Sequence, residues 1–261
     1  MIIQGHRGCR AEFPENSIEG VKRAIALGAF AVEVDIQLTQ DHELVVVHDS
    51  ELFEGYYRLP AERQSLRVWE TALSTLTQVE FGHEPLTKFP EQQVAVCHIP
   101  SLRDLIDASA DHRLNLELKV PFEKNEDQSW LRGYAEVIIG LLTKQNYHPW
   151  RIKSFNLSLL EKLAKINHSL PLHYLIEAPL NLDSWTNFAD FVRPNPALRG
   201  LSVRHDLIDQ RMVDRCQALQ IHLSAWTVND LATAERLKAL GVIDLVSDDP
   251  GLLLKWEEKH G

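Results

Sequence analysis

The sequence predicts a TIM barrel, with an extra β-hairpin after the second strand and a small inserted segment. Short runs rich in β-branched residues alternate with amphipathic helical runs, which is typical of a parallel sheet covered by helices. Eight such strand runs occur within 261 residues, a usual length for one barrel. The rival fold, an open doubly wound sheet, usually carries a glycine-rich first turn. Gly5-His6-Arg7-Gly8 does not match that turn.

The expected barrel strands are spaced along the whole chain. They are residues 2–5, 31–36, 114–119, 151–155, 172–176, 200–203, 221–226 and 244–247. Most are followed by apolar residues at helical spacing. Clear examples of these helical runs are residues 156–167, 210–219 and 231–240.

The first helix has recognisable start and stop signals. Apolar residues recur at helical spacing from Ile18, and the run stops near Gly28. Asn16 resembles an N-cap, with Glu19 as the acid of a capping box. The cap alone would explain Asn16, although a helix N-terminus beside an active site could also orient a phosphate.

A ninth strand-like run, residues 43–48, begins just after the second strand. Only Thr39-Gln40-Asp41-His42 separates the two runs. A parallel crossover needs about a dozen residues or more, so we expect an antiparallel hairpin. A turn centred on this linker would place His48 opposite Val34 and Asp35.

Residues 50–98 fit the barrel pattern poorly. They contain Tyr56-Tyr57, Trp69 and Phe81-Gly82-His83-Glu84-Pro85. We interpret them as an inserted, partly helical segment near the mouth of the active site, inside a single domain that spans residues 1–261. Such a segment could shape a substrate pocket.

Composition and charge narrow the class of function. The chain is 44% hydrophobic and has a net charge of −10, which argues against nucleic acid or an anionic membrane as the main partner. It shows no signal-peptide pattern and no apolar run of transmembrane length, so we expect no stable membrane anchor. Cys9, Cys97 and Cys216 lack metal-binding spacing, which favours reduced thiols and a cytoplasmic location. The oligomeric state stays open.

Candidate chemical groups gather where the strands end, which is where barrel enzymes carry their active sites. Three strand ends and the hairpin supply three carboxylates, two cations and two histidines. In chain order these are His6, Arg7, Glu33, Asp35, His48, Glu117 and Lys119. Carboxylates one residue apart on a strand point the same way and can share a hard cation. Two histidines can act as general acid and base, and an adjacent arginine favours a phosphate-bearing substrate.

Each of these groups also has a purely structural explanation. Arg7 could form a surface salt bridge, and His48-Asp49 could form an Asx turn. Glu117 and Lys119 could simply pair with each other, and the two carboxylates of the second strand could lie on an exposed face. Trp226, at the end of a late strand, could pack in the core or form a wall of the pocket. All of these explanations holding together is much less plausible than a shared site.

An ordered set of motifs resembles the glycerophosphodiester phosphodiesterase family. The main motifs are His6-Arg7-Gly8, Pro14-Glu15-Asn16, Glu33-Val34-Asp35, His48-Asp49 and Glu117-Leu118-Lys119. Further matches are Ile99-Pro100-Ser101-Leu102, Ser154-Phe155-Asn156, Trp226-Thr227-Val228-Asn229 and Ser247-Asp248-Asp249-Pro250. Each motif is short, but the set covers nearly the full length and its order is specific.

The resemblance implies metal-dependent hydrolysis of a glycerophosphodiester to sn-glycerol 3-phosphate and an alcohol. It implies one divalent cation, Mg²⁺ or Ca²⁺, and oxygen ligands also permit Mn²⁺. By motif match the metal ligands are Glu33, Asp35 and Glu117. The acid–base pair is His6 and His48, and the phosphate-binding cations are Arg7 and Lys119. We add Asn16 and Trp226 as candidate substrate contacts. The resemblance leaves open which histidine is the acid, and whether water or the neighbouring glycerol hydroxyl attacks.

Two departures from the family leave the head group open. The chain reads Ser50-Glu51-Leu52-Phe53-Glu54-Gly55-Tyr56-Tyr57 where a threonine- and glycine-rich loop is common. The usual glycine before the last strand is replaced in Gly241-Val242-Ile243-Asp244-Leu245. Two alternatives therefore stand beside the main hypothesis. One is lysophospholipase D-like cleavage of lysophospholipids, with aromatic residues of the insert lining an acyl channel, and the other is a non-catalytic binder of phosphate ligands.

Overall fold

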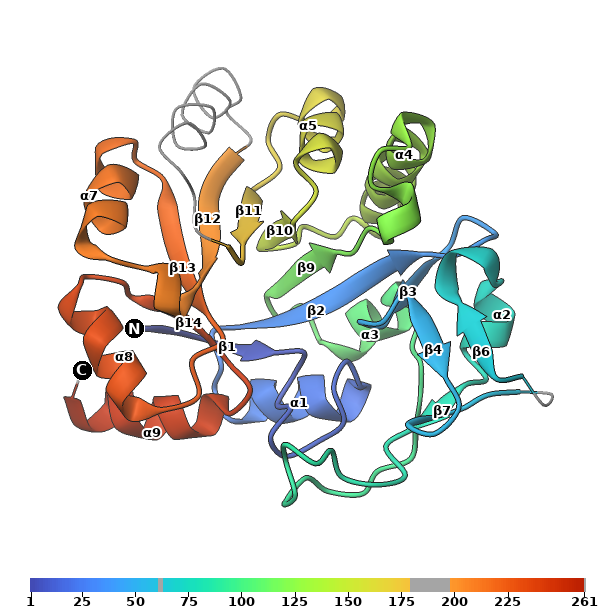
Figure 1. The fold of residues 1–261 in the computed structure, drawn as a ribbon, viewed down its shortest axis with the longest axis horizontal. Helices are drawn as coiled ribbons and strands as arrows, with labels where there is room; N and C mark the ends of the chain where they lie inside the picture. The colour runs from blue at the N-terminus through green and yellow to red at the C-terminus, as the bar shows by residue number, and fades with distance from the viewer. Residues whose placement is uncertain (61–62, 179–197, 261) are drawn as a thin grey trace.

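The centre of the molecule is a closed barrel of parallel strands (Figure 1). The computed structural model describes residues 1–60, 63–178 and 198–260. Within these ranges the sheet order is β1-β14-β13-β12-β11-β10-β9-β2, and pairing of β1 with β2 closes it. The strands are β1 (Ile2–His6), β2 (Ala31–Leu38), β9 (Leu114–Leu118), β10 (Arg151–Ser154), β11 (Leu172–Ile176), β12 (Leu198–Arg204), β13 (His222–Trp226) and β14 (Asp244–Ser247). The predicted TIM barrel is confirmed, and every predicted barrel strand has its counterpart.

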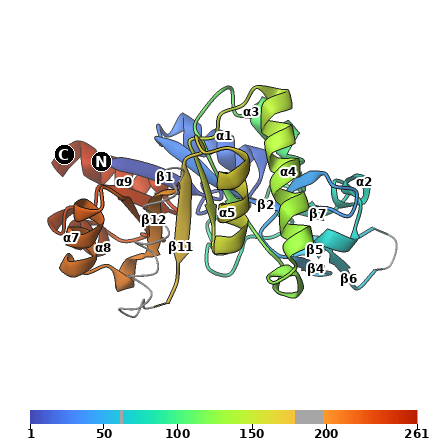
Figure 2. The same ribbon diagram turned by 90° about the horizontal axis from the view of Figure 1, so that it is seen from above.

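Helices cover the outside of this barrel (Figure 2). They are α1 (Ile18–Ala26), α3 (Leu102–Ala108), α4 (Gln128–Gln145), α5 (Leu157–Ile166), α7 (Gln210–Ala218), α8 (Leu231–Ala239) and α9 (Pro250–His260), with the 3-10 turns η2 (Phe122–Lys124) and η3 (His205–Leu207). Three of them, α5, α7 and α8, agree with the predicted helical runs to within one residue. Side-chain caps start these three helices, because Asn156, Asp209 and Asp230 each accept a hydrogen bond from the backbone N–H three residues later.

The cap of α1 was predicted one residue too early. Ser17 is the N-cap, and its hydroxyl accepts a hydrogen bond from the N–H of Gly20 at 3.0 Å. Asn16 lies outside the helix with a φ of 56°, a left-handed conformation that asparagine tolerates better than most residues. The capping box with Glu19 is therefore wrong, and the amide of Asn16 is directed elsewhere.

The predicted hairpin is confirmed, although its second strand is shorter than expected. The end of β2 pairs antiparallel with β3 (Leu44–Val46), with Ile36 opposite Val46. Beyond β3, the N–H of Val47 still donates to the carbonyl of Asp35 at 3.0 Å. Because residues 36–38 extend β2 past its pairing with β1, Glu33 and Asp35 lie within β2 rather than at its end.

The described part of residues 50–98 forms two small antiparallel sheets with short helical turns. Its elements are β4 (Glu51–Phe53), β5 (Tyr57–Arg58), β6 (Ser65–Arg67), η1 (Val68–Glu70), α2 (Leu73–Leu76), β7 (Glu80–Phe81) and β8 (Cys97–His98). Tyr57 and Phe81 are buried in a hydrophobic cluster of its own. The side chain of Gln92 donates to the carbonyls of Arg10 and Phe13, both at 2.7 Å, which joins this segment to the loop after β1.

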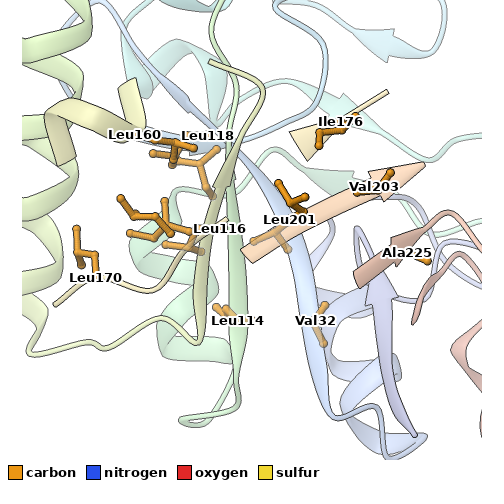
Figure 3. Packing of buried hydrophobic residues seen from close by; sticks show 14 of the residues in the cluster. Val32, Leu114, Leu116, Leu118, Leu160, Leu170, Ile176, Leu201, Val203 and Ala225 are labelled. Atoms are coloured by element: carbon orange, nitrogen blue, oxygen red, sulfur yellow. The ribbon is translucent and has the colours of Figure 1, made fainter. Parts of the chain in front are cut away.

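Strand alternation separates an apolar outer layer from a polar barrel interior. Figure 3 shows Leu116 and Leu118 of β9 gathered with Leu160 of α5 in the outer layer. The interior of a TIM barrel is usually filled by branched apolar side chains. Here Arg151 donates to Asp244 at 2.5 Å across the interior.

The same interior layer continues towards β1 and β9. Gln4 donates to Asp244 and accepts from Asn115, and all three side chains are buried.

Among the described residues, no helix combines the length and the apolar character needed to cross a membrane.

Candidate active site

Three buried carboxylates of the neighbouring strands β2 and β9 lie close together. Glu33, Asp35 and Glu117 each place an oxygen within 4.8 Å of the other two. The register explains this, because Asp35 lies opposite Glu117 and Glu33 points to the same face as Asp35. Within the described part of the chain, Glu33 Oε1 and Asp35 Oδ1 are buried and accept no hydrogen bond. Such an unsatisfied, all-oxygen group of ligands suits a hard divalent cation, so the triad can hold one.

The charge of this triad is unevenly distributed. Burial, together with Asp35 and Glu117, raises the pKa of Glu33 well above its ordinary value. Burial would also raise the pKa of Asp35, but Arg7 and Lys119 hold that pKa well below its usual range. Without a cation, the triad therefore favours a proton on Glu33. A bound divalent cation would favour the ionised form of all three groups.

Two cations flank Asp35. Arg7 Nε lies 3.2 Å from Asp35 Oδ2, and Arg7 Nη1 donates to Glu15 Oε1 at 3.0 Å. Lys119 Nζ donates to Glu117 Oε1 at 2.7 Å and lies 3.7 Å from Asp35 Oδ1. Glu117 and Lys119 do pair with each other, which was one of the purely structural explanations. Both residues nevertheless line the same cavity as Arg7. The cations are thus placed to bind an anion beside the triad.

His6, the last residue of β1, is oriented by a carboxylate. Its Nδ1 lies 2.6 Å from Asp248 Oδ1, and its Nε2 lies 4.0 Å from Glu33 Oε2. Burial lowers the pKa of His6, while Asp248 opposes that change. Asn229 holds the other oxygen of Asp248 by donating to Oδ2 at 2.7 Å. Because Nδ1 is engaged, Nε2 is the nitrogen left to exchange a proton in the pocket.

His48 shows the same arrangement on the hairpin. Its Nδ1 lies 2.8 Å from Asp49 Oδ1. The side-chain nitrogen of Gln37 lies within 3.0 Å of the backbone oxygens of Val47, His48 and Asp49, and so anchors the segment that carries the histidine. In both histidines Nδ1 is held by a carboxylate, and both residues line the same cavity.

One cavity of about 140 Å³ brings the predicted residues together. Seven of the nine predicted site residues line it: His6, Arg7, Glu33, His48, Glu117, Lys119 and Trp226. Asp35 is fully buried and does not line the cavity, but its oxygen completes the triad. Asn16 does not line the cavity. Its side chain donates to Asp35 Oδ2 at 2.8 Å and accepts from the N–H of Asp35 at 3.1 Å, so it positions a carboxylate.

The far wall and the floor of the cavity come from β10 to β13. Phe155 and Trp226 meet edge to face with ring centroids 5.8 Å apart, and Trp226 Nε1 donates to the carbonyl of Ser202 at 3.0 Å. Glu177 lines the same cavity. Lys153 enters from β10 and is buried, and burial lowers its pKa to about 8.

Sequence reasoning missed several of these residues. Asp248 and Glu15 stand in quoted motifs but received no role, and Gln37 looked like an ordinary polar residue of a strand. Lys153 offered a signal that could have been used, because a lysine in the middle of a buried strand is costly without a partner or ligand.

The model of the glycerophosphoryl diester phosphodiesterase family matches residues 6–252. The chain belongs to this family. It is 26% identical over 272 residues to the glycerophosphodiester phosphodiesterase of Caldanaerobacter subterraneus subsp. tengcongensis, covering 100% of this chain and 99% of the relative. It is 25% identical to a glycerophosphodiester phosphodiesterase of Bacillus subtilis, covering 100% of this chain and 87% of that relative. Membership of the family makes the protein a phosphoric diester hydrolase.

Solved structures of the family share the fold. An Oleispira antarctica phosphodiesterase, in complex with the product sn-glycerol-3-phosphate, superposes with a TM-score of 0.79 at 22% identity, covering 98% of this chain and 96% of that one. The glycerophosphodiester phosphodiesterase of Thermotoga maritima gives a TM-score of 0.73 at 22% identity, covering 98% of both chains. At this identity the likeness establishes the barrel, and the chemistry must be argued from the residues of this chain.

Proposed function

We propose that this protein hydrolyses glycerophosphodiesters to sn-glycerol 3-phosphate and an alcohol, with one divalent cation held by Glu33, Asp35 and Glu117. The observation that carries the proposal is the convergence of this triad with two histidines in one small cavity. Such a cation would supply Lewis-acid stabilisation of negative charge on the phosphate. Mg²⁺, Ca²⁺ and Mn²⁺ all suit the oxygen ligands.

The cations of the chain bind and orient the phosphate. Arg7 and Lys119 lie on either side of Asp35, so an anion beside the triad meets both of them. Their fixed positive charge in a partly desolvated site stabilises the charge that develops as the ester bond breaks. Glu15 and Asn16 support this arrangement, because they hold Arg7 and Asp35 respectively.

The two histidines carry the proton transfers. One Nε2 removes a proton from the nucleophile, either water or the neighbouring glycerol hydroxyl, and the other donates a proton to the leaving alkoxide. If the hydroxyl attacks, a cyclic phosphate forms first, and water then opens it to sn-glycerol 3-phosphate. Asp248 and Asp49 bind the Nδ1 atoms and so orient both rings. A neutral base and a protonated acid together give a bell-shaped dependence of rate on pH.

Lysophospholipase D-like cleavage receives less support. A mouse relative, 22% identical to this chain, bears the name lysophospholipase D. The aromatic residues expected to line an acyl channel pack on one another instead: Tyr56 and Tyr57 have centroids 4.9 Å apart, and Tyr57 and Phe81 have centroids 6.2 Å apart. Within the described residues they lie in or against the hydrophobic cluster of the insert and do not line the central cavity.

The proposal is tested by release of sn-glycerol 3-phosphate from glycerophosphocholine and glycerophosphoethanolamine. The protein is first stripped with EDTA, and Mg²⁺, Ca²⁺ or Mn²⁺ is then returned. His6→Ala and Glu33→Ala are measured beside His168→Ala, a matched change at an exposed histidine. We expect metal-dependent release in the wild type and His168→Ala, and none in the other two variants.

Three results would contradict the proposal. Full activity in EDTA would show that the reaction needs no divalent cation. Turnover of lysolipid micelles without turnover of either soluble diester would favour the lysophospholipase reading. Binding of glycerophosphocholine without turnover in any metal would favour a binding protein.

A further inference from the structure

Lys153 is a buried lysine without a hydrogen-bond or ion-pair partner among the described residues. It is 1% exposed, lies opposite Glu117 in the register of β10 and β9, and lines the central cavity. Within residues 1–60, 63–178 and 198–260, its Nζ makes no ion pair within 4.0 Å and no hydrogen bond. The other cations of the cavity, Arg7 and Lys119, both contact carboxylates.

An amine in this position is costly unless a ligand uses it. Burying an unpaired ammonium strongly reduces the stability of the folded protein, and an apolar side chain of similar length would avoid that loss. The negative charges of Glu33 and Glu117 favour the protonated form of Lys153, but both carboxylates lie too far from its Nζ to form an ion pair. The reaction described above gives Lys153 no task, because the phosphate already has two cations and the proton transfers have two histidines.

The cavity has two chemically different ends. Its floor holds Lys153 and Ser202, whose hydroxyl accepts from Ser224 at 3.0 Å, together with the apolar Leu175 and Val246. Its rim combines the rings of Phe155 and Trp226 with the carboxylate of Glu177. A floor that presents hydrogen-bond donors in a cavity of about 140 Å³ suits a small group with hydroxyl acceptors. A choline or ethanolamine group carries positive charge and would be repelled by Lys153.

We infer that Lys153 donates a hydrogen bond to the terminal hydroxyl of the glycerol, the one farthest from the phosphate, and so makes the glycerol end of the diester enter the barrel first. The inference rests on the proposed glycerophosphodiester substrate. An amine donates hydrogen bonds whether or not it is protonated, so Lys153 offers a donor to the hydroxyl in either state. Lys153 is thereby a specificity-determining residue: it selects glycerol over alcohols that lack this hydroxyl.

The test compares two substrates that differ in one hydroxyl. They are glycerophosphocholine and its analogue made with propane-1,2-diol, which lacks the terminal hydroxyl. Both are given to the wild type, Lys153→Met, Lys153→Gln and the control Lys165→Met, which changes an exposed lysine of α5. Calorimetric binding of sn-glycerol 3-phosphate and of propane-1,2-diol phosphate provides a readout that needs no turnover.

We expect Lys153→Met to lower kcat/KM for glycerophosphocholine, and affinity for sn-glycerol 3-phosphate, by about 10- to 100-fold, as for loss of a hydrogen bond from a charged donor. Values for the deoxy ligands should stay within about threefold, because they never formed that bond. Lys153→Gln keeps a donor of similar size and should recover part of the discrimination. Lys165→Met should match the wild type.

An equal fall for both substrates and both products would overturn the inference, since Lys153 would then act on the triad or the phosphate. The Lys153→Gln variant gives the same comparison if Lys153→Met does not fold, as thermal unfolding would reveal. A wild type that cleaves neither substrate would contradict the proposed function. In that case the two phosphate ligands would still test Lys153, because preference for the glycerol compound would be lost only if the hydrogen bond exists.

Discussion

Replacing Asp248 with asparagine isolates the part that orientation of His6 plays in the reaction. Asp248 binds His6 Nδ1 at 2.6 Å, and Asn229 fixes its other oxygen. Asparagine has nearly the same shape but no charge, and its amide can donate as well as accept. If the amide nitrogen faces Nδ1, the proton moves to Nε2 and the ring can no longer serve as a base in the pocket.

The expected loss follows from the bond that is removed. A hydrogen bond to a charged partner contributes about 1.5–3 kcal/mol, which corresponds to a fall of roughly 10- to 150-fold in kcat. The sign of the pH effect also follows. Burial lowers the pKa of His6 and Asp248 raises it, so the asparagine variant should have a still lower pKa at this ring. The limb of the pH–rate profile that reports His6 should move to lower pH.

The assay is release of sn-glycerol 3-phosphate across the pH range, with chemistry shown to be rate-limiting by single-turnover measurements. Asp206→Asn is the matched control, because Asp206 is exposed and pairs with Arg204 at 2.6 Å in a turn that does not line the cavity. Thermal unfolding of both variants establishes that they fold. Activity of Asp248→Asn within about twofold of the control, with an unmoved profile, would refute the reasoning that orientation by Asp248 matters.

Three further predictions concern the triad, the barrel interior and a helix cap. A raised pKa means that folded Glu33 keeps a proton which the unfolded chain releases, so its burial reduces stability as pH rises above the ordinary value of 4.5. Glu33→Gln should therefore raise the melting temperature of metal-free protein near neutral pH and weaken its rise with added Ca²⁺; a lower melting temperature would contradict this. Asp244→Ala leaves Arg151 buried without its anion and should cost ~3–5 kcal/mol in urea unfolding, most of which Asp244→Leu with Arg151→Met should restore. Ser17→Ala should cost ~0.5–2 kcal/mol by loss of the cap of α1, and an unchanged urea midpoint would speak against that cap.

Local patterns in the sequence were enough to predict the barrel. Buried parallel strands are near-continuous apolar runs, and each amphipathic helix repeats its apolar residues at a spacing that no strand shares. The same logic located the triad, because Glu33 and Asp35 interrupt such a run at positions that point the same way. Where two signals lay side by side, as with Asn16 and Ser17, the sequence could not decide which side chain caps the helix, since both residue types do so well.

Contacts between distant segments were beyond this reasoning. Asp248 is 242 residues from His6, and they meet only because β14 closes the barrel against β1. Gln37 positions His48 by hydrogen bonds to backbone oxygens. Every residue has such an oxygen, so the residue types do not reveal these bonds. The roles of Asp248 and Gln37 depend on closure of the barrel and on the turn of the hairpin.

The unusual interior explains how the barrel tolerates Lys153. Arg151 lies two residues earlier on β10, and its charge lowers the pKa of Lys153. Asp244 opposes this effect and binds Arg151 at 2.5 Å. Without the carboxylate of Asp244, Arg151 and Lys153 would both be buried cations of one strand, and burial of unpaired charge is strongly destabilising. Asp244, the first residue of β14, therefore neutralises Arg151 and leaves Lys153 to the substrate.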